Sequence, residues 1–388
     1  MVLRLAVLAL FCLGLPPLGW WLSGRPWGPI VSFPPEFADP GYPDFSAAVT
    51  AAYWLVAAIL VAWWFRKGGA RSALEAPDGT PAGAKRRFPW WGWAAAAWQA
   101  IWWGLAWTRM EWFSPLQAYT YVPLWFGFIV LLNAFVLARG GCPPLVARTG
   151  TFLSLFPLSA AFWWVFEYLN RFARNWVYVG VEQFGAGAYF IHATICFSTV
   201  LPAVVSMKSL LETVPRLQRF LARGPRLHSA FGGKGARAPG SGGSADGIAR
   251  KPRRIAFGSF LLLAAAVGLL GVGAVPEWTY PLLWVGPLLV WIGLARLAGR
   301  GPVFPGLRRG DWRSTGNWAL AALACGFFWE TWNQYSLAKW VYDIPFLETA
   351  KIFEMPLAGY LGYLPFGLEC AIVVRLATGA AFGDRLRG

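Results

Sequence analysis

Charged residues are scarce in this chain. Asp, Glu, Lys and Arg make up only 13% of its 388 residues, whereas 57% of the residues are hydrophobic. A soluble domain of this size carries a surface that is about a quarter to a third charged. Apolar runs of roughly 18–22 residues recur along the chain, and each is long enough to cross a bilayer. The composition therefore excludes an ordinary soluble protein and predicts an all-α integral membrane protein.

Histidine and cysteine are also rare, with two and five residues respectively. The cysteines are scattered, lie mostly in apolar runs and form no C-x-x-C pair. Neither a disulfide framework nor a structural zinc site is therefore expected. Two histidines do not suffice for a histidine-rich metal centre, and no glycine-rich nucleotide-binding loop occurs. We expect no metal site and no redox cofactor.

The apolar runs predict about ten transmembrane helices. They cover residues 4–22, 46–65, 89–107, 122–138, 151–169, 188–207, 255–273, 280–298, 315–332 and 356–377.

Lysine and arginine gather in alternate loops between these runs. All but six of the 34 fall on one side, the exceptions being Arg25, Arg109, Arg171, Arg174, Lys339 and Lys351. By the positive-inside rule, this bias predicts a multi-pass protein of the bacterial inner membrane with both termini in the cytoplasm. We expect the first helix to be retained. The net charge of +16 is then mainly a topology signal, with attraction of anionic lipid headgroups to the cytoplasmic loops. No nucleic-acid partner is expected, and the oligomeric state is left open.

The chain divides into five parts. Residues 1–65 form two N-terminal helices with an outer loop, 66–88 a basic cytoplasmic loop, 89–215 a first four-helix repeat, 216–254 a flexible basic cytoplasmic linker, and 255–388 a second four-helix repeat. The two repeats share a pattern: Tyr-Thr-Tyr-x-x-Leu-Trp-x-Gly at 119–127 matches Trp-Thr-Tyr-x-x-Leu-Trp-x-Gly at 278–286. Four helices is an even number, so the repeats point the same way. This predicts two tandem parallel repeats related by a pseudo-twofold axis along the membrane normal.

Each repeat carries the same polar motif at the outer end of an apolar run. Phe-Glu-Tyr-Leu-Asn at 166–170 and Trp-Glu-Thr-Trp-Asn at 329–333 each place Glu and Asn on one helix face, and each is followed by Trp-x-Tyr. A carboxylate at this depth costs free energy unless it is paired or faces a polar cavity, so it indicates a functional site. The alternative is that Glu and Asn cross-link helices while the aromatics form an interfacial belt. We expect the two motifs to face each other or to flank a shared cavity near the outer leaflet. The residues are Glu167, Asn170, Trp176 and Tyr178 in the first repeat and Glu330, Asn333, Trp340 and Tyr342 in the second.

The second repeat carries further acids. Glu354 lies in the expected outer loop, and Glu369, four residues beyond a proline, is the deepest acid of the chain. The first repeat has Ser206 where the second has Glu369. It also has His192, a substrate-binding candidate or a packing residue, where the second has Met355. The repeats have therefore diverged, and we expect one asymmetric site.

Tryptophan is abundant, with 26 residues. Seven of them lie between positions 90 and 107, and the spacing of Trp91, Trp98 and Trp102 marks one helix face. Such a face indicates lipid-facing or interfacial packing. The alternative is an aromatic-lined cavity, which can stabilise a carbocation or hold a flat apolar ligand.

Two resemblances bear on the function. The segment 327–369, from Phe-Phe-Trp-Glu-Thr-Trp-Asn to Tyr-Leu-Pro-Phe-Gly-Leu-Glu, resembles a group of uncharacterised, Trp-rich bacterial multi-pass membrane proteins and implies no activity. A second pattern runs Trp-acid at Trp329-Glu330, Trp-x-aromatic at Trp340-x-Tyr342, and Pro365 followed by Glu369. This order is similar to that of the membrane lycopene cyclases, which are duplicated carotenoid ring-forming enzymes. That family places two adjacent acids after its proline and has about three helices per repeat, whereas this chain has one acid and four helices. The second resemblance implies an isoprenoid substrate.

The leading hypothesis is a membrane enzyme that acts on an isoprenoid or other lipid by acid/base chemistry. Glu330 and Glu369 are the expected acid and base, with Glu167 and Glu354 as partners or charge stabilisers. The expected substrate-binding residues are Asn170, Asn333, Trp176, Tyr178, Trp340, Tyr342 and His192. The alternatives are a transporter or channel with a proton or cation path along these acids, and a structural or assembly protein in which they only bridge helices.

Overall fold

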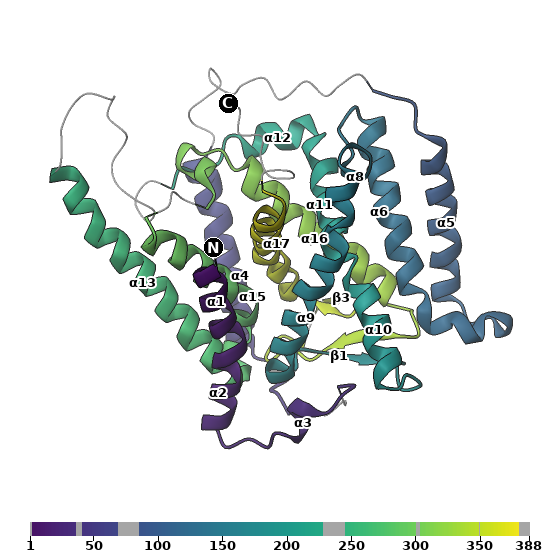
Figure 1. Cartoon of the computed structure of the whole chain (residues 1–388), viewed down its shortest axis with the longest axis horizontal. Helices are drawn as coiled ribbons and strands as arrows, with labels where there is room; N and C mark the ends of the chain where they lie inside the picture. The colour runs from purple at the N-terminus through teal and green to yellow at the C-terminus, as the bar shows by residue number, and fades with distance from the viewer. Residues whose placement is uncertain are drawn as a thin grey trace.

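The structure, a computed structural model, describes residues 2–35, 41–68, 85–227, 245–299, 303–348 and 350–379 (Figure 1). Helices dominate the described residues. The first half contains α1 (Val2–Ala9), α2 (Leu15–Leu22), α3 (Gly28–Val31), α4 (Ala47–Lys67), α5 (Trp90–Trp107), α6 (Tyr121–Ala138), α7 (Pro144–Ala147), α8 (Thr149–Leu153), α9 (Leu155–Ala173) and strand β1 (Trp176–Val179). The second half contains α10 (Ala186–Phe197), α11 (Val200–Glu212), α12 (Pro215–Leu221), α13 (Ala245–Ala274), α14 (Pro276–Thr279), α15 (Pro281–Leu297), α16 (Arg313–Asn333), β2 (Lys339–Tyr342), β3 (Lys351–Ile352), β4 (Met355–Pro356) and α17 (Tyr363–Thr378).

Within the described ranges, seven helical stretches are long and apolar enough to cross a membrane. They are Leu3–Leu22, Ala47–Lys67, Tyr121–Ala138, Thr149–Ala173, Ala186–Glu212, Pro252–Ala274 and Leu357–Thr378. The other three expected spans are helices as well, namely α5, α15 and α16. However, α15 has only 17 residues. The tryptophans and Gln99 lower the hydropathy of α5, and polar side chains such as Thr, Asn and Glu lower that of α16. The chain is thus an all-α protein of the membrane-spanning type.

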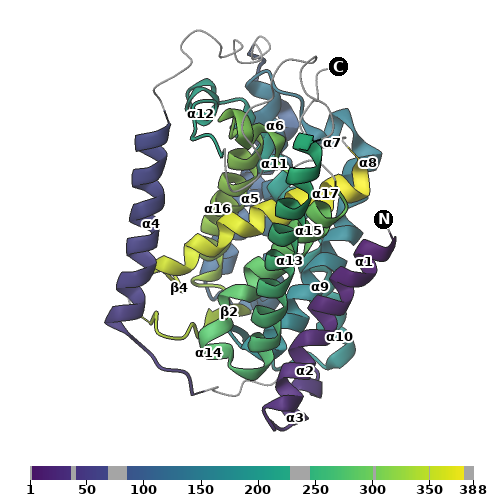
Figure 2. The same ribbon diagram turned by 90° about the vertical axis from the view of Figure 1, so that its left-hand side faces the viewer.

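The N-terminal helix is packed closely against α13 (Figure 2). A Cβ atom on Gly19 would lie 1.9 Å from the Leu270 carbonyl oxygen, and one on Gly273 would lie 1.9 Å from the Pro16 carbonyl oxygen. Only glycine permits such an approach, which is typical of helix contacts in membranes.

Helix α4 stands at the edge of the bundle, and none of its residues is buried (Figure 2). It is attached mainly at its two ends. Near its N-terminus, the Tyr53 hydroxyl lies 3.1 Å from the Tyr280 hydroxyl, and the Thr50 hydroxyl donates to the Phe346 carbonyl at 3.3 Å. Near its C-terminus, Trp63 and Trp64 pack edge-on against Trp312. Its remaining surface is apolar and faces outward, as expected of a lipid-exposed helix.

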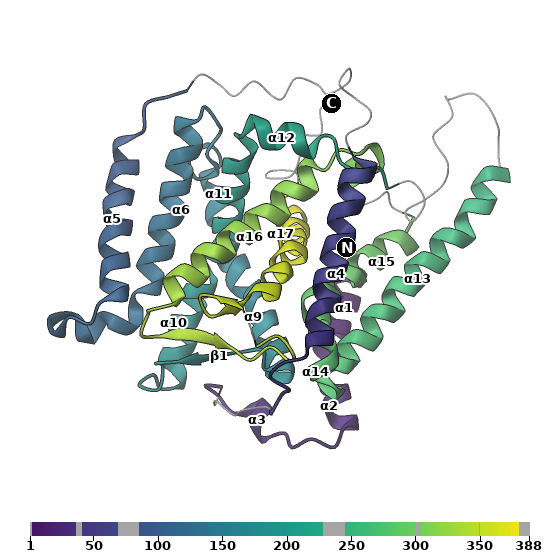
Figure 3. The same ribbon diagram turned by 180° about the vertical axis from the view of Figure 1, so that it is seen from behind.

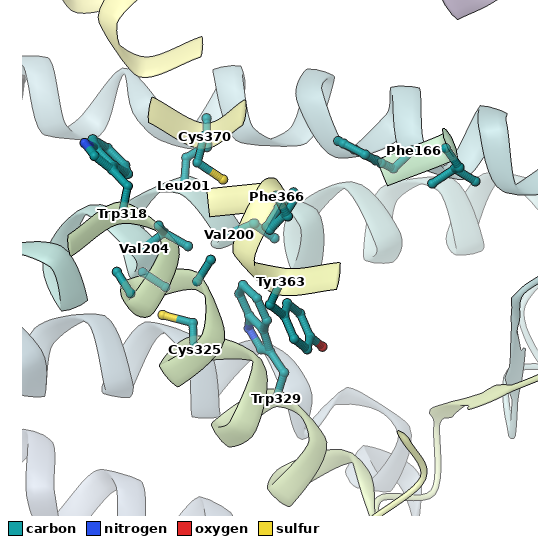
Figure 4. Close-up of a cluster of buried hydrophobic side chains, with 14 of the residues drawn as sticks. Phe166, Val200, Leu201, Val204, Trp318, Cys325, Trp329, Tyr363, Phe366 and Cys370 are labelled. Carbon is teal, nitrogen blue, oxygen red and sulfur yellow. The ribbon is translucent and has the colours of Figure 1, made fainter. Parts of the chain in front are cut away.

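One hydrophobic core runs through both expected repeats. Figure 4 shows its centre, where Trp318 and Cys325 of α16 lie near Leu201 of α11 and Cys370 of α17. Trp318, Leu201, Cys325 and Cys370 are all fully buried. Helix α11 contacts α16 and α17 as well as α6 and α9. Helices from both halves of the chain therefore share this core.

Part of the expected flexible linker, 216–254, is ordered structure. Its first residues belong to α12, where Leu221 is buried and its carbonyl accepts from the Trp312 backbone N–H at 2.9 Å. The Trp312 indole donates to the Pro225 carbonyl at 2.8 Å. The end of the linker belongs to α13, and residues 228–244 lie outside the described residues. The burial of Leu221 and the hydrogen bonds of Trp312 fix the start of a segment whose composition predicts a flexible chain.

The two Trp-x-Tyr segments form an antiparallel ribbon, β1 with β2, which Figure 3 shows below α16 and α17. In its register Trp176 pairs with Tyr342 and Tyr178 pairs with Trp340. The ribbon lies at the end of the bundle that also carries α3, opposite to α12 (Figure 1). We call this the outer end, following the charge distribution of the sequence.

Candidate functional site

Glu167 lies near the end of α9, and its side chain is buried. Its Oε1 atom accepts three hydrogen bonds. The Trp163 indole donates at 2.9 Å, the Trp176 indole at 3.1 Å and the Tyr178 hydroxyl at 2.7 Å. Three donors on one oxygen compensate much of the cost of burying the carboxyl group.

Glu330 occupies the corresponding place in α16 and is fully buried. Its Oε1 atom also has three donors: the Tyr342 hydroxyl at 2.7 Å, the Tyr363 hydroxyl at 2.9 Å and the Trp340 indole at 3.4 Å. Its Oε2 atom is buried without a hydrogen-bond partner among the described residues. One carboxylate oxygen is thus held in place while the other has no partner.

Asn170 and Asn333 hold the ribbon to the helix ends. The Asn170 amide donates to the Trp176 carbonyl at 2.7 Å, and its oxygen accepts from the Asn175 backbone at 2.8 Å. The Asn333 amide donates to the Trp340 carbonyl at 2.7 Å and accepts from the Trp340 N–H at 2.9 Å. Both side chains therefore satisfy backbone groups and fix the strands that carry two of the three donors of each glutamate.

The third donor differs between the two sites in a complementary way. Four residues before the glutamate, the first site has Trp163 and the second has Gly326. Two residues before the proline of the returning helix, the first has Val200 and the second has Tyr363. A Cβ atom on Gly326 would lie 2.4 Å from the Tyr363 ring. Tyr363 thus uses the space that a side chain at 326 would need, so each site has one bulky donor at this place.

The six donors line one cavity of about 300 Å³ whose wall is overwhelmingly apolar. Aromatic rings form much of the wall. Trp284 stacks on Phe166 at 5.3 Å between ring centroids and packs 5.4 Å from Trp176, and Tyr121 packs edge-on against Trp340 at 5.5 Å. The two carboxyl groups lie behind this wall and reach the cavity through their tyrosine and tryptophan donors. Burial raises the pKa of the Tyr178 and Tyr342 phenols well above the usual value, so both remain protonated donors.

Glu369 does not line this cavity, although Pro365 of the same helix does. Its Oε1 atom accepts from the Leu288 backbone N–H at 3.0 Å. The interior proline at 287 interrupts the regular hydrogen bonding of α15, and this contact satisfies a donor beside it. At the position that the sequence matches with Glu369, the Ser206 hydroxyl accepts from the Asn133 amide at 2.9 Å and likewise joins two helices, α11 and α6. Glu369 therefore occupies a helix-joining position.

Glu354 is also outside the cavity wall, in the turn between β3 and β4, where it forms an ion pair with Lys339. His192 and Met355, which occupy matching positions, both line the cavity. The His192 ring packs against Tyr119 at 5.1 Å and Phe184 at 5.3 Å, and its Nε2 atom lies 3.8 Å from the Cys196 sulfur. Among the described residues, no group of three or more His, Cys, Asp and Glu side chains could hold a metal ion.

The sequence did not reveal several residues of the site. Trp163 could have been found because it lies one helical turn before Glu167. Tyr363 could not be found in this way, because its matching position holds Val200. Trp284 could not be found either, because its match, Trp125, is outside the cavity wall. The face of α5 marked by Trp91, Trp98 and Trp102 does not contribute to the cavity wall; Trp98 is exposed, and Trp91 and Trp102 are half-buried.

Comparison of the chain with protein-family models, with curated proteins and with solved structures gives no match. The functional interpretation therefore depends on the geometry of the cavity.

Proposed function

We propose that this chain is a bacterial inner-membrane enzyme that acts on an isoprenoid or other lipid by acid/base chemistry. One observation carries the proposal: the donors of two buried carboxyl groups line a single aromatic cavity. An apolar cavity of about 300 Å³ suits a hydrocarbon chain or ring better than a hydrated ion.

In this proposal Glu330, Tyr342 and Tyr363 form the acid. A proton held by this group passes through a tyrosine hydroxyl to a double bond of the substrate and leaves a carbocation. The faces of Trp284 and Trp329 stabilise the positive charge. A proton then leaves a neighbouring carbon and returns through a tyrosine hydroxyl to the carboxylate of Glu330, so the acid is restored and the composition of the substrate is unchanged. Cyclisation and double-bond isomerisation both follow this balance and need no redox cofactor.

We further propose the ten-helix arrangement of two tandem parallel repeats with both termini in the cytoplasm. The β1–β2 register supports it, because Trp176 pairs with Tyr342 and Tyr178 pairs with Trp340, as expected of two equivalent segments. The equivalent hydrogen bonds of Glu167 and Glu330 support it as well. The basic loops then face the cytoplasm, where they attract anionic lipid headgroups.

The test compares the lipids of cells that produce the wild-type chain with those of cells that produce Glu330→Gln, Tyr342→Phe or Glu167→Gln. Mass spectrometry should show a lipid that the wild type converts and that accumulates with Glu330→Gln. Loss of general acid catalysis typically lowers the rate by about 10²–10⁴-fold. Glu111→Gln, at an exposed carboxylate, is the matched control and should leave conversion unchanged.

The same variants separate the alternatives. Loss of proton or cation flux in reconstituted vesicles, with no lipid converted, would favour a transporter. Unchanged lipids and flux at normal expression would favour a structural protein and would contradict the proposal.

A further inference from the structure

A second pocket lies at the outer end of the molecule and shares no wall residue with the aromatic cavity. It has a volume of about 680 Å³ and is formed by the end of α2, the end of α9, α14 and the segments around Tyr42 and Phe346. Its wall contains two arginines and one glutamate, together with several large apolar side chains.

The two arginines converge on one indole ring. The Arg25 guanidinium carbon lies 5.3 Å from the Trp20 ring centroid, and that of Arg174 lies 5.5 Å from it. Two like charges on one ring repel each other unless an anion lies between or beside them. Glu277 compensates in part, with 3.9 Å between its Oε2 atom and an Arg25 nitrogen. One positive charge remains in excess among the wall residues.

Arg174 has no ion pair and no side-chain hydrogen bond to any residue that the structure describes; its guanidinium group lies over the Trp20 ring. A guanidinium group has five N–H donors in a planar fork that fits phosphate and carboxylate oxygens. Its half-buried position therefore leaves these donors available to a ligand.

The backbone at Arg174 is strained. Arg174 ends α9 in the left-handed conformation, with φ 49° and ψ 37°, where glycine is the usual residue. Phe346, another wall residue, also has a positive φ of 66°. Such conformations cost of order 1–3 kcal/mol each and occur preferentially at ligand sites. An arginine at a position that favours glycine, without an internal ion pair, indicates that the side chain has an external partner.

We propose that this pocket binds a phosphate group, with Arg174 and Arg25 as its ligands. The apolar walls formed by Phe172, Trp278 and Phe346, at the end of membrane-spanning helices, favour the phosphate of a lipid headgroup over free phosphate.

The test uses the purified full-length chain in neutral detergent and measures the affinity of dioctanoyl phosphatidylglycerol by calorimetry. Arg174→Gly is the decisive variant, because glycine relieves the left-handed strain and so keeps the fold while it removes the ligand. Arg174→Gly and Arg25→Gln should each weaken the affinity at least tenfold. Lys351→Gln, at an exposed outer lysine, is the control and should bind as the wild type does.

Two further probes identify the source of the phosphate. Dioctanoylglycerol lacks the phosphate and should show no binding that depends on Arg174. Inorganic phosphate should compete only weakly; equal competition would assign the pocket to free phosphate. Unchanged affinity in Arg174→Gly, or no binding of either phosphate probe to the wild type, would overturn the proposal. Neither result depends on Glu330 or on lipid conversion.

Discussion

At the scale of single residues, the two glutamates differ from ordinary buried acids in the way their oxygens are used. Each directs one oxygen to three donors. Concentrating the donors on one atom fixes the carboxyl group, while the other oxygen of Glu330 has no partner in the part of the chain that the structure describes. Glu369 also has one buried oxygen without a partner among the described residues, but it does not line the cavity. Glu330 combines an unpartnered oxygen with tyrosine donors that line the cavity, and this combination supports the proposed proton transfer.

The asparagines beside them should be structural. Asn333→Ala removes two hydrogen bonds to the Trp340 backbone and leaves its N–H and carbonyl unpaired. Each unsatisfied group typically costs about 1–3 kcal/mol, so the thermal midpoint in detergent should fall clearly. Asn170→Ala should behave in the same way. Gln183→Ala, at an exposed residue of the same end, should leave the midpoint unchanged. If Asn333→Ala melts like the wild type, the ribbon does not depend on this contact.

At the scale of elements, the two glutamate sites differ in which helix supplies the third donor: α9 supplies Trp163 to Glu167, and α17 supplies Tyr363 to Glu330. Beside Glu167 the two adjacent positions hold Trp163 and Val200, and beside Glu330 they hold Gly326 and Tyr363. In each pair only one side chain is large. This division is specific to each pair of helices, α9 with the start of α11 and α16 with the start of α17. It makes the second site the one whose acid is contacted by two tyrosines.

The contact between Gly326 and Tyr363 can be tested with one methyl group. Gly326→Ala places a Cβ atom 2.4 Å from the Tyr363 ring, so the ring must move away from Glu330. Overpacking of this kind typically costs about 1–3 kcal/mol, and a lower melting temperature should accompany a loss of activity. Gly104→Ala in α5 is the matched control, because nothing lies within 4 Å of its Cβ position. It should be neutral or stabilising, since alanine is the better helix former.

A double variant gives the sharper result. Gly326→Trp combined with Tyr363→Val reproduces the arrangement of the first site, and we expect it to be more stable than Gly326→Trp alone. Additive effects of the two changes would show that the side chains do not share the space.

Particular residues show how far the sequence predicts these elements. The Glu-x-x-Asn spacing predicts one helix face, and the Trp-x-Tyr that follows predicts aromatics at the same end, because both depend on local periodicity. The sequence did not predict the β1–β2 pairing, because four-residue strands have little intrinsic stability and depend here on two distant asparagines. Nor did it reveal that Glu369 contacts Leu288 rather than the cavity, since its direction is set by packing between α15 and α17.

At the scale of the whole molecule, one hydrophobic core joins helices from both halves of the chain, and the aromatic cavity lies within that assembly. The outer pocket and the cavity are formed by neighbouring segments: Tyr280 and Leu347 line the cavity, whereas Trp278 and Phe346 line the pocket. The sequence predicted the sides of the membrane from charge alone. It predicted a shared cavity at the two Glu-x-x-Asn motifs, but neither the full set of residues that line it nor the arginine pocket, because cavities depend on how side chains from many elements fit together.

The orientation itself has a direct test in the native cysteines. Of the five, Cys142 alone is exposed, and it lies in the basic loop between α6 and α7. Since basic loops stay in the cytoplasm, a membrane-impermeant maleimide should label Cys142 in inverted membrane vesicles and not in intact spheroplasts. The variant Cys142→Ala should abolish the labelling in both preparations. Adding Gln183→Cys to that variant places a thiol on an exposed residue of the outer end, and it should be labelled in spheroplasts. The reverse pattern would place the ribbon, the arginine pocket and the mouth of any lipid site on the cytoplasmic side, and the proposed headgroup would then belong to the inner leaflet.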